Sequence, residues 1–331
     1  MDRKGILAFL IITFGLTYLI EIPPLLAGVK LVGLTSSTAT YIFLPIMFMP
    51  ALGALVTTRF ITREGWGGLG LHAGRQGMAR SWRRYVATGL LIPALFALVY
   101  ALTWALGLGQ PDWGLKYFQG LYATSGAVAP AMPDTRLVLL GVFLASLTVG
   151  TLFNWLFCLG EELGWRGYLL PKLMPLGKLR AYLLLGVIWS VWHWPLLWMG
   201  FAYGQPGSPL ALVAFTALTT GLGVYLNELR LKHDSALLAG WVHGVFNTQK
   251  LGAWFLLFPQ VSPFLGGYAG LVGLVVWLAL GLWETRRAQR LGGESGTAKN
   301  TKGESGTPQC EHPGGRPPEH AENAEKRLAV R

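Results

Sequence analysis

Residues 137–160 have the sequence LVLLGVFLASLTVGTLFNWLFCLG, which contains no charged side chain. A helix needs roughly 20 predominantly apolar residues to cross the hydrocarbon core of a bilayer, so this stretch is long enough to do so. Seven other stretches are also predominantly apolar over such a length, and the full set is residues 5–27, 40–58, 85–108, 137–160, 180–203, 209–229, 235–255 and 264–283. We therefore predict an all-α fold, a polytopic transmembrane helical bundle of about eight spans.

The composition of the chain agrees with a membrane protein. Hydrophobic residues make up 52% of the sequence and charged residues only 13%, with a mean hydropathy of +0.44, which is too apolar for an ordinary soluble domain. The two cysteines, Cys158 and Cys310, are too few for a disulfide framework or a thiolate metal site. The apolar run after the basic start Met1–Lys4 has no small-residue cleavage site, so we expect a retained first helix.

The positive charges predict the orientation of the chain. The connection 59–84 is rich in arginine, whereas the connections 109–136 and 201–208 on the opposite side carry little positive charge. Further basic residues follow the fourth, sixth and eighth spans, namely Arg166, Lys172, Lys178, Arg180, Arg230, Lys232, Arg286, Arg287 and Arg290. Because basic loops stay in the cytoplasm, we expect an integral protein of the plasma (inner) membrane with both termini cytoplasmic. The same anchoring explains the net charge of +11 without a nucleic-acid partner.

The last part of the chain has a different composition. Residues 286–331 are rich in Gly, Pro, Glu and Lys, and the sequence GESGT occurs at 293–297 and again at 303–307. Such a segment cannot bury enough apolar surface to fold. We therefore predict a transmembrane domain of residues 1–285 and a disordered polar cytoplasmic tail of residues 286–331.

Ionisable side chains inside a membrane are costly, so those within the predicted spans are candidate functional residues. Of sixteen acidic residues and six histidines, the ones within or at the edge of a span are Glu21, Glu161, Glu162, His193 and His243. Glu21 precedes Pro23 and Pro24, where we expect the first helix to be broken near the outer interface. We interpret Glu21 as structural.

The two adjacent carboxylates at the end of the fourth span have different expected partners. On a helix, Glu162 and Arg166 are four residues apart and share a face, so they should form an ion pair. This pair is either a charge cap at the cytoplasmic interface or a direct part of catalysis. Glu161 points about 100° away around the helix and is therefore free for chemistry.

The two histidines complete a set of groups suited to peptide hydrolysis. His193 lies among aromatic residues, where a structural histidine bonded to a hydroxyl is the alternative interpretation, and His243 shares a helix face with Asn247. A carboxylate can deprotonate a water, imidazoles can hold a metal or position that water, and an amide can stabilise an oxyanion. The chain lacks the Gly-x-Ser-x-Gly motif of serine hydrolases and the His-Glu-x-x-His motif of zincins.

The order of these motifs resembles the CPBP (Abi) family of membrane proteins. This family includes the type II CAAX prenyl endopeptidases and the bacteriocin-processing and immunity proteins. The motifs that carry the resemblance lie between residues 137 and 250, and they are Glu161-Glu162-x-x-x-Arg166, Trp189-x-x-x-His193 and His243-x-x-x-Asn247. Trp189 departs from the usual phenylalanine.

The resemblance implies roles for these residues in a protease-like domain. Glu161 would activate the attacking water, His193 and His243 would bind that water or a metal, and Asn247 would help to stabilise the oxyanion. Glu162 and Arg166 would support them. Glu161, His193 and His243 could hold a divalent metal such as zinc, and a metal-free glutamate mechanism remains open. The implied substrate is a peptide or a lipid-modified protein, which is cleaved near the cytoplasmic face of the surrounding lipid.

Two other functions are compatible with the sequence. A non-catalytic scaffold or immunity protein of the same fold could use the polar residues to hold its helices together. A proton-coupled transporter could also use intramembrane Glu and His, but it would predict two-fold internal repeats. All the motifs instead lie in the fourth, fifth and seventh predicted spans.

Overall fold

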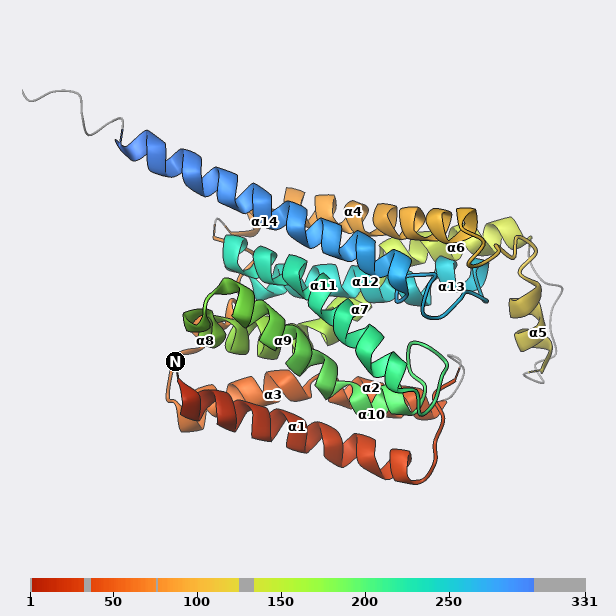
Figure 1. Cartoon of the computed structure of the whole chain (residues 1–331), viewed down its shortest axis with the longest axis horizontal. Helices are drawn as coiled ribbons and strands as arrows, with labels where there is room; N and C mark the ends of the chain where they lie inside the picture. The colour runs from red at the N-terminus through yellow and green to blue at the C-terminus, as the bar shows by residue number, and fades with distance from the viewer. Residues whose placement is uncertain (1, 33–36, 76, 125–133, 301–331) are drawn as a thin grey trace, which may run out of the picture. The chain divides into compact units, whose positions relative to one another are not determined.

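The computed structural model describes residues 2–32, 37–75, 77–124 and 134–300 (Figure 1). Within these ranges the chain is helical, without a named strand, and an isolated bridge joins Gly109 to Val261. The predicted all-α class is thus confirmed. The chain divides into two units, 1–288 and 289–331, and all the candidate site residues lie in the first.

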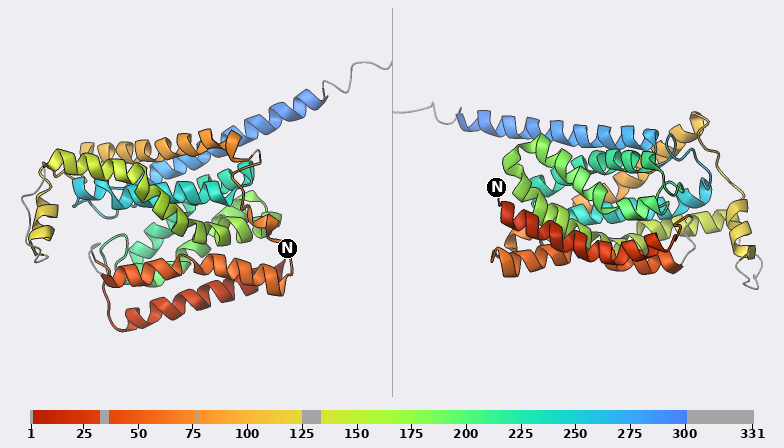
Figure 2. Two further views of the ribbon diagram at one scale, coloured as in Figure 1. Left: turned by 180° about the vertical axis from the view of Figure 1, so that it is seen from behind. Right: turned by 60° about the horizontal axis from the view of Figure 1, so that its bottom comes forward.

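The first unit contains a core of four helices flanked by others. The bounds of the helical elements are α1 Arg3–Leu26, α2 Ser37–Ile46, α3 Met49–Val56, η1 Thr57–Ile61, η2 Trp66–Leu69, α4 Met78–Ala105, α5 Lys116–Thr124, α6 Thr135–Leu147, α7 Val149–Glu162, η3 Leu163–Leu169, α8 Leu170–Leu173, η4 Met174–Leu176, α9 Lys178–Trp192, α10 Trp194–Trp198, α11 Pro209–His233, α12 Ala236–Leu251, α13 Ala253–Leu257 and α14 Leu271–Asn300. Helices α7, α9, α11 and α12 lie between α1 and α3 on one side and α4 on the other (Figures 1 and 2).

The predicted count of eight spans is not confirmed for the described residues. Four helices are long and apolar enough to cross a membrane, namely Arg3–Leu26, Ile42–Ile61, Met78–Ala105 and Pro209–His233. The pair Thr135–Leu147 and Val149–Leu176 adds a fifth span, bent by 41°. Of the other three predicted spans, two correspond to shorter helices, since α9 has 15 residues and α12 has 16. The third overlaps the start of α14, which has 30 residues but is not among the helices that are apolar enough.

Proline affects two of these helices in opposite ways. We predicted one span over residues 180–203, but α9 ends at Trp192 and α10 begins at Trp194, with Pro195 in its first turn. The prediction of a break before Pro23 was wrong, because α1 continues through Pro23 and Pro24 to Leu26. A proline lacks an N–H and frees a carbonyl four residues earlier, and near a helix end this causes little disruption.

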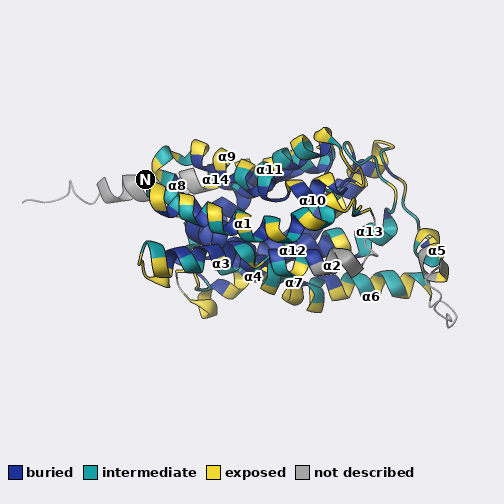
Figure 3. Cartoon of the chain, turned by 90° about the horizontal axis from the view of Figure 1, so that it is seen from below, coloured by how far each residue is buried: buried dark blue, intermediate teal, exposed yellow. Residues whose placement is uncertain are grey.

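Helix α1 buries polar residues within its apolar stretch and exposes large apolar ones. Its buried face carries Thr13, Thr17 and Glu21, whereas Leu19 and Leu26 are 72% and 81% exposed. Buried and exposed residues alternate along α1 in Figure 3. In water this pattern would be unfavourable, but lipid chains solvate leucine as well as a protein core does. The arrangement therefore supports an integral membrane protein.

Ion pairs gather the predicted cytoplasmic segments at one end of the first unit. Lys172 donates to Asp2 and to Glu64, in both cases at 2.8 Å, so the start of the chain meets the connection 59–84. Hydrogen bonds from Lys172 and from the Gly5 backbone lower the pKa of Asp2 below its usual value.

The basic segment after the sixth predicted span contacts the connection 59–84 at this end. The same segment also contacts the end of the eighth predicted span. Ser235 donates to the carbonyl of His72, and Lys232 pairs with Glu284 at 2.6 Å. The predicted grouping of these connections on one side is therefore consistent with the contacts between them.

Helix α14 differs from the prediction at both ends. It begins at Leu271, after turns that occupy the start of the predicted span 264–283, and it continues to Asn300. Helical backbone thus extends beyond residue 285, where we expected the tail to begin. The rest of the predicted tail, residues 301–331, lies outside the described residues.

Candidate active site

Close packing of α7 against α12 forms the base of the site. Of the helices that the structure describes, these two make the most extensive pairing. A Cβ atom added to Gly240 would lie 3.2 Å from Cα of Leu159, and one added to Gly244 would lie 2.8 Å from Cα of Trp155. Small residues four apart let two helix backbones approach closely. The approach places the carboxylates at the end of α7 beside His243.

Glu162 is the centre of a fully buried network. Its Oε1 accepts from Nη1 of Arg166 at 3.0 Å, as the spacing predicted, and lies 2.8 Å from Nδ1 of His243. Nε of Arg166 donates to Asn227 at 3.1 Å. Glu162 and Arg166 have no exposed side-chain surface, so they are interior structure rather than an interfacial cap.

A π-helical turn supports the position of Arg166. Immediately after Glu162, the backbone changes from α-helix to the π-helix η3, in which the N–H of Leu170 bonds the carbonyl of Trp165. Extra residues in a helical turn cost stability and recur at functional sites. The guanidinium of Arg166 also lies 4.2 Å from the ring centre of Trp189.

Glu161 has a different hydrogen-bond partner from Glu162. Its Oε2 accepts from Nε1 of Trp189 at 2.8 Å, and its Oε1 has no hydrogen bond among the described residues. The residue is 3% exposed, whereas Glu162 is 0% exposed. One carboxylate oxygen is thus held in place while the other remains available to react.

The helix break after α9 orients His193. Its Nδ1 lies 2.9 Å from the carbonyl oxygen of Trp189, and Tyr18 donates to the carbonyl of Val191 at 2.7 Å. Val191 is four residues before Pro195, so Tyr18 satisfies the carbonyl that the proline leaves free. The break therefore fixes the ring of His193 without leaving the backbone unsatisfied.

Both histidines use the same nitrogen, Nδ1, in a bond within the protein. A carbonyl or carboxylate oxygen only accepts, so Nδ1 of His193 and Nδ1 of His243 carry the proton in these bonds. In the neutral imidazoles, Nε2 then keeps a lone pair. Each ring can accept a hydrogen bond from a water or act as a ligand through Nε2.

Asn247 completes the predicted set, but with an unexpected neighbour. Its Nδ2 donates to Sγ of Cys158 at 3.1 Å, and Asn247 is 8% exposed. An amide has a second N–H, which is available for an oxyanion. Sequence reasoning set Cys158 aside and missed the contacts of Trp189 and Asn227, because these depend on helix packing.

The predicted metal ligands are not assembled into a metal site. Among the described residues, no group of three or more His, Cys, Asp or Glu side chains is placed to share an ion. Glu161, His193 and His243 each use one donor atom in a hydrogen bond within the protein and keep another, which is the usual arrangement of histidines that bind a metal. A metal requirement therefore stays a prediction.

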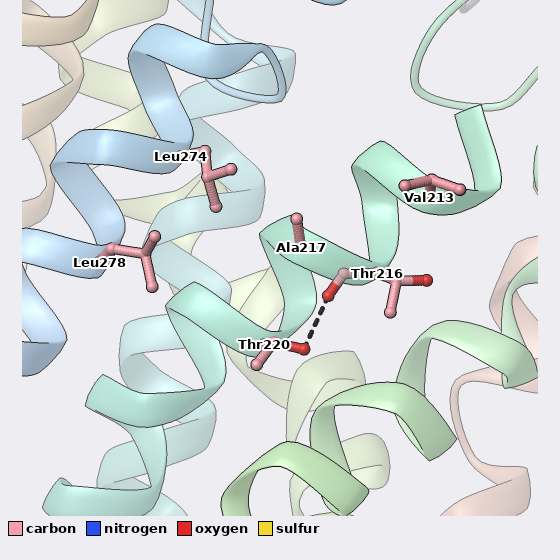
Figure 4. A pocket seen from close by; sticks show the side chains of 6 residues that line it. All are labelled: Val213, Thr216, Ala217, Thr220, Leu274 and Leu278. Carbon is pink, nitrogen blue, oxygen red and sulfur yellow. Dashed lines mark hydrogen bonds between the residues drawn. The ribbon is translucent and has the colours of Figure 1, made fainter. Parts of the chain in front are cut away.

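An apolar groove lies apart from the site, between α11 and α14. Its cavity volume is about 450 Å³, and its lining residues are Val213, Thr216, Ala217, Thr220, Leu274 and Leu278 (Figure 4). None of the candidate catalytic residues lines it. The groove therefore does not contain the chemistry inferred from the motifs.

Comparison with known proteins identifies the motif-bearing part of the chain. The family described as type II CAAX prenyl endopeptidase Rce1-like matches residues 143–249. The CAAX prenyl protease 2 of Methanococcus maripaludis is 46% identical over 44 residues, which are 13% of this chain and 16% of that protein. The resemblance predicted from the motifs is thus confirmed, and residues 143–249 form a domain similar to the Rce1-like type II CAAX prenyl endopeptidases.

Proposed function

We propose that the protein is an intramembrane endopeptidase in which Glu161 activates the attacking water. The observation that carries this proposal is the contrast between two adjacent carboxylates. Each carboxylate has one oxygen without a hydrogen bond among the described residues, but Glu162 is paired with the Arg166 cation, bonded to His243 and fully buried. Glu161 is bonded only to the neutral indole of Trp189 and is 3% exposed. A general base needs a free oxygen in a fixed position, and Glu161 meets both conditions.

The proposed reaction is a direct attack of water on the scissile carbonyl. Glu161 takes a proton from the water through Oε1, and the water oxygen bonds to the carbonyl carbon. Asn247 donates a hydrogen bond to the resulting oxyanion. Glu161 then returns the proton to the leaving nitrogen as the C–N bond breaks, which yields a carboxylic acid and an amine.

In this mechanism the histidines hold the water in position. Nε2 of His193 and of His243 can each accept a hydrogen bond, so either can orient the water hydrogen that Glu161 does not remove. The hydrogen bond that Nδ1 of His243 donates to Glu162 fixes the ring of His243, in the way that a carboxylate orients a catalytic histidine. Glu162 and Arg166 are therefore positioning residues.

The substrate is proposed to be a lipid-modified C-terminal tail that reaches the site from the cytoplasmic leaflet. Two observations support this choice. The matched family and the matched relative are named for CAAX prenyl substrates. Glu161 lies in the last turn of α7, which is followed by η3. The chain then reaches the end of the first unit where the basic connections gather. The second observation favours the cytoplasmic side.

The decisive experiment compares Glu161→Gln with Glu21→Gln. Both replace a buried intramembrane carboxylate, but Glu21 lies in α1, outside the proposed machinery. We expect Glu161→Gln to lower cleavage of a lipidated, quenched-fluorescence peptide by at least about 10²-fold, the lower end of general-base contributions. Glu21→Gln should retain the activity of the unaltered protein.

A chelator and a metal analysis are applied to the same preparations. Activity that survives chelation supports glutamate chemistry, whereas loss with recovery on adding zinc supports a metal. Full activity in Glu161→Gln would contradict the proposed base. Absence of cleavage across a broad peptide panel would favour the non-catalytic scaffold.

A further inference from the structure

The side chain of Trp189, on α9, contacts three groups of the candidate site through different parts of its indole. Its Nε1 donates to Oε2 of Glu161 at 2.8 Å, and its ring centre lies 4.2 Å from the guanidinium of Arg166. The ring also meets the ring of His243 nearly at right angles, with 5.3 Å between the two centres. Trp189 is 3% exposed, so all three contacts lie in the interior of the protein.

The cation beside this ring has a hydrogen-bonding group that it does not use. Arg166 is bonded to Glu162 and Asn227, but its Nη2 has no hydrogen-bond partner among the described residues. Glu161 is next to Glu162 in the chain, yet within the described ranges Glu162 alone forms an ion pair with Arg166. Because a buried cation attracts a nearby carboxylate, we expect Glu161 to join this ion pair unless another contact holds it.

Trp189 supplies such a contact to both groups. Its indole N–H bonds Oε2 of Glu161, and the face of its ring binds the cation of Arg166. A neutral donor orients a carboxylate without cancelling its charge, whereas a carboxylate that is paired with a cation is a weaker proton acceptor. The indole thus leaves Glu161 able to accept a proton, while Glu162 is paired with Arg166.

We propose that Trp189 is a positioning residue that makes Glu161, rather than Glu162, the base of the reaction. This proposal rests on the proposed endopeptidase function and adds a residue that acts through Glu161. A phenylalanine at this position would keep a ring beside Arg166 but would have no N–H for the carboxylate. The indole nitrogen is therefore the atom on which the position of the base depends.

Trp192, on the same helix, provides a matched control. It is 1% exposed, and its Nε1 donates at the same distance, 2.8 Å, but to the hydroxyl of Thr17 in α1. Both tryptophans also meet the ring of His193 edge-on. Phenylalanine at either position therefore removes a buried indole bond of equal length, and only at position 189 is the acceptor the proposed base.

The test measures kcat and KM of the full-length variants with the lipidated quenched-fluorescence peptide. Trp189→Phe should lower kcat by about 10- to 100-fold, which is typical when a group that orients a site residue is lost, and should leave KM nearly unchanged. Trp192→Phe should keep the kcat of the unaltered protein. Trp189→Leu, which also removes the ring from Arg166, should lose more activity than Trp189→Phe.

A tryptophan analogue separates the N–H from the shape of the ring. Benzothienylalanine has a sulfur atom in place of the indole N–H, so it fills nearly the same space but cannot donate the hydrogen bond. Trp189→benzothienylalanine should lower kcat as Trp189→Phe does, although it leaves no cavity, and the same change at Trp192 should have little effect. Full kcat with the analogue at position 189 would show that only the shape of the ring is required, and would overturn the proposal.

A double-mutant cycle tests the contact without catalysis. Trp189→Phe should lower the melting temperature in detergent less in a Glu161→Ala background than in the unaltered protein, because alanine has already removed the acceptor. Trp192→Phe should lower it equally in both backgrounds, since its hydrogen bond goes to Thr17. Additive effects of Trp189→Phe and Glu161→Ala would mean that the indole does not hold the carboxylate, which would also overturn the proposal.

The outcomes separate this proposal from the proposed function. If Glu161→Gln is inactive while Trp189→Phe loses no more activity than Trp192→Phe, the role of Trp189 is overturned and the endopeptidase stands. If nothing is cleaved but Trp189 and Glu161 are coupled in the cycle, the contact between the two side chains stands. The proposed function then fails, and the role of Trp189 in the reaction fails with it.

Discussion

At the scale of single residues, two neighbouring glutamates have different surroundings. The i,i+4 spacing was sufficient to predict the pair of Glu162 with Arg166, because it depends on local helix geometry. The bond between Glu162 and His243 joins residues 81 positions apart, and that between Glu161 and Trp189 joins residues 28 positions apart. No local pattern predicts such contacts, so the sequence identified the candidate residues but not their partners.

This difference predicts that Glu162→Gln destabilises the protein more than Glu161→Gln. Removing the charge of Glu162 leaves the fully buried Arg166 without its counter-ion, which typically costs about 3–5 kcal/mol. Glu161 has only the neutral indole of Trp189 as its hydrogen-bond partner, so its replacement should change stability little. Thermal unfolding of the two variants in detergent, followed by size-exclusion chromatography, measures the contrast. Equal melting temperatures would contradict the assignment of Glu162 as a positioning residue.

At the scale of helices, hydropathy predicted where most apolar elements lie but not where they break. Each of two predicted spans is apolar enough to cross the membrane as one helix, yet each is divided. The span 180–203 is interrupted at His193, and the span 137–160 is interrupted at Thr148. Hydropathy averages over a window and does not detect a change of direction within it. The break at His193 was nevertheless signalled by Pro195, since a helix usually ends at or before the residue that precedes a proline.

The packing of α7 against α12 leads to a prediction for Gly244. A Cβ at this position would lie 2.8 Å from both the N and the Cα atoms of Trp155, and backbone atoms cannot move aside as a flexible side chain does. Gly244→Ala should therefore cost about 1–3 kcal/mol, the usual range for overpacking, and should reduce cleavage by separating His243 from Glu162. Gly15→Ala is the matched control, since nothing lies within 4 Å of the added methyl group and alanine favours a helix. Unchanged melting temperature and activity in Gly244→Ala would show that the helices are not held at this distance by the glycine.

At the scale of the whole molecule, the gathering of basic connections at one end determines how the chain should lie in the membrane. The pairs of Lys172 with Asp2 and Glu64 link the chain start and the connection 59–84 to the segment after η3. Positive charges near spans remain cytoplasmic, so this end should face the cytoplasm and the opposite end should not. The proposed entry of a cytosolic lipidated tail requires this orientation, because the free carboxylate of Glu161 lies on the part of α7 nearest to the basic end.

Two exposed tryptophans provide a matched test of this orientation. Trp66 lies in the basic connection and is 53% exposed, and Trp113 lies in the connection 109–136 and is 63% exposed. In a background with Cys310→Ser, and with the buried Cys158 retained, we expect Trp66→Cys to react with a membrane-impermeant maleimide only after the cells are opened, because the cytoplasm is closed to the reagent. Trp113→Cys should react in intact cells. The reverse labelling pattern would place Glu161 near the opposite leaflet, and a substrate modified in the cytosol could then not reach the proposed base.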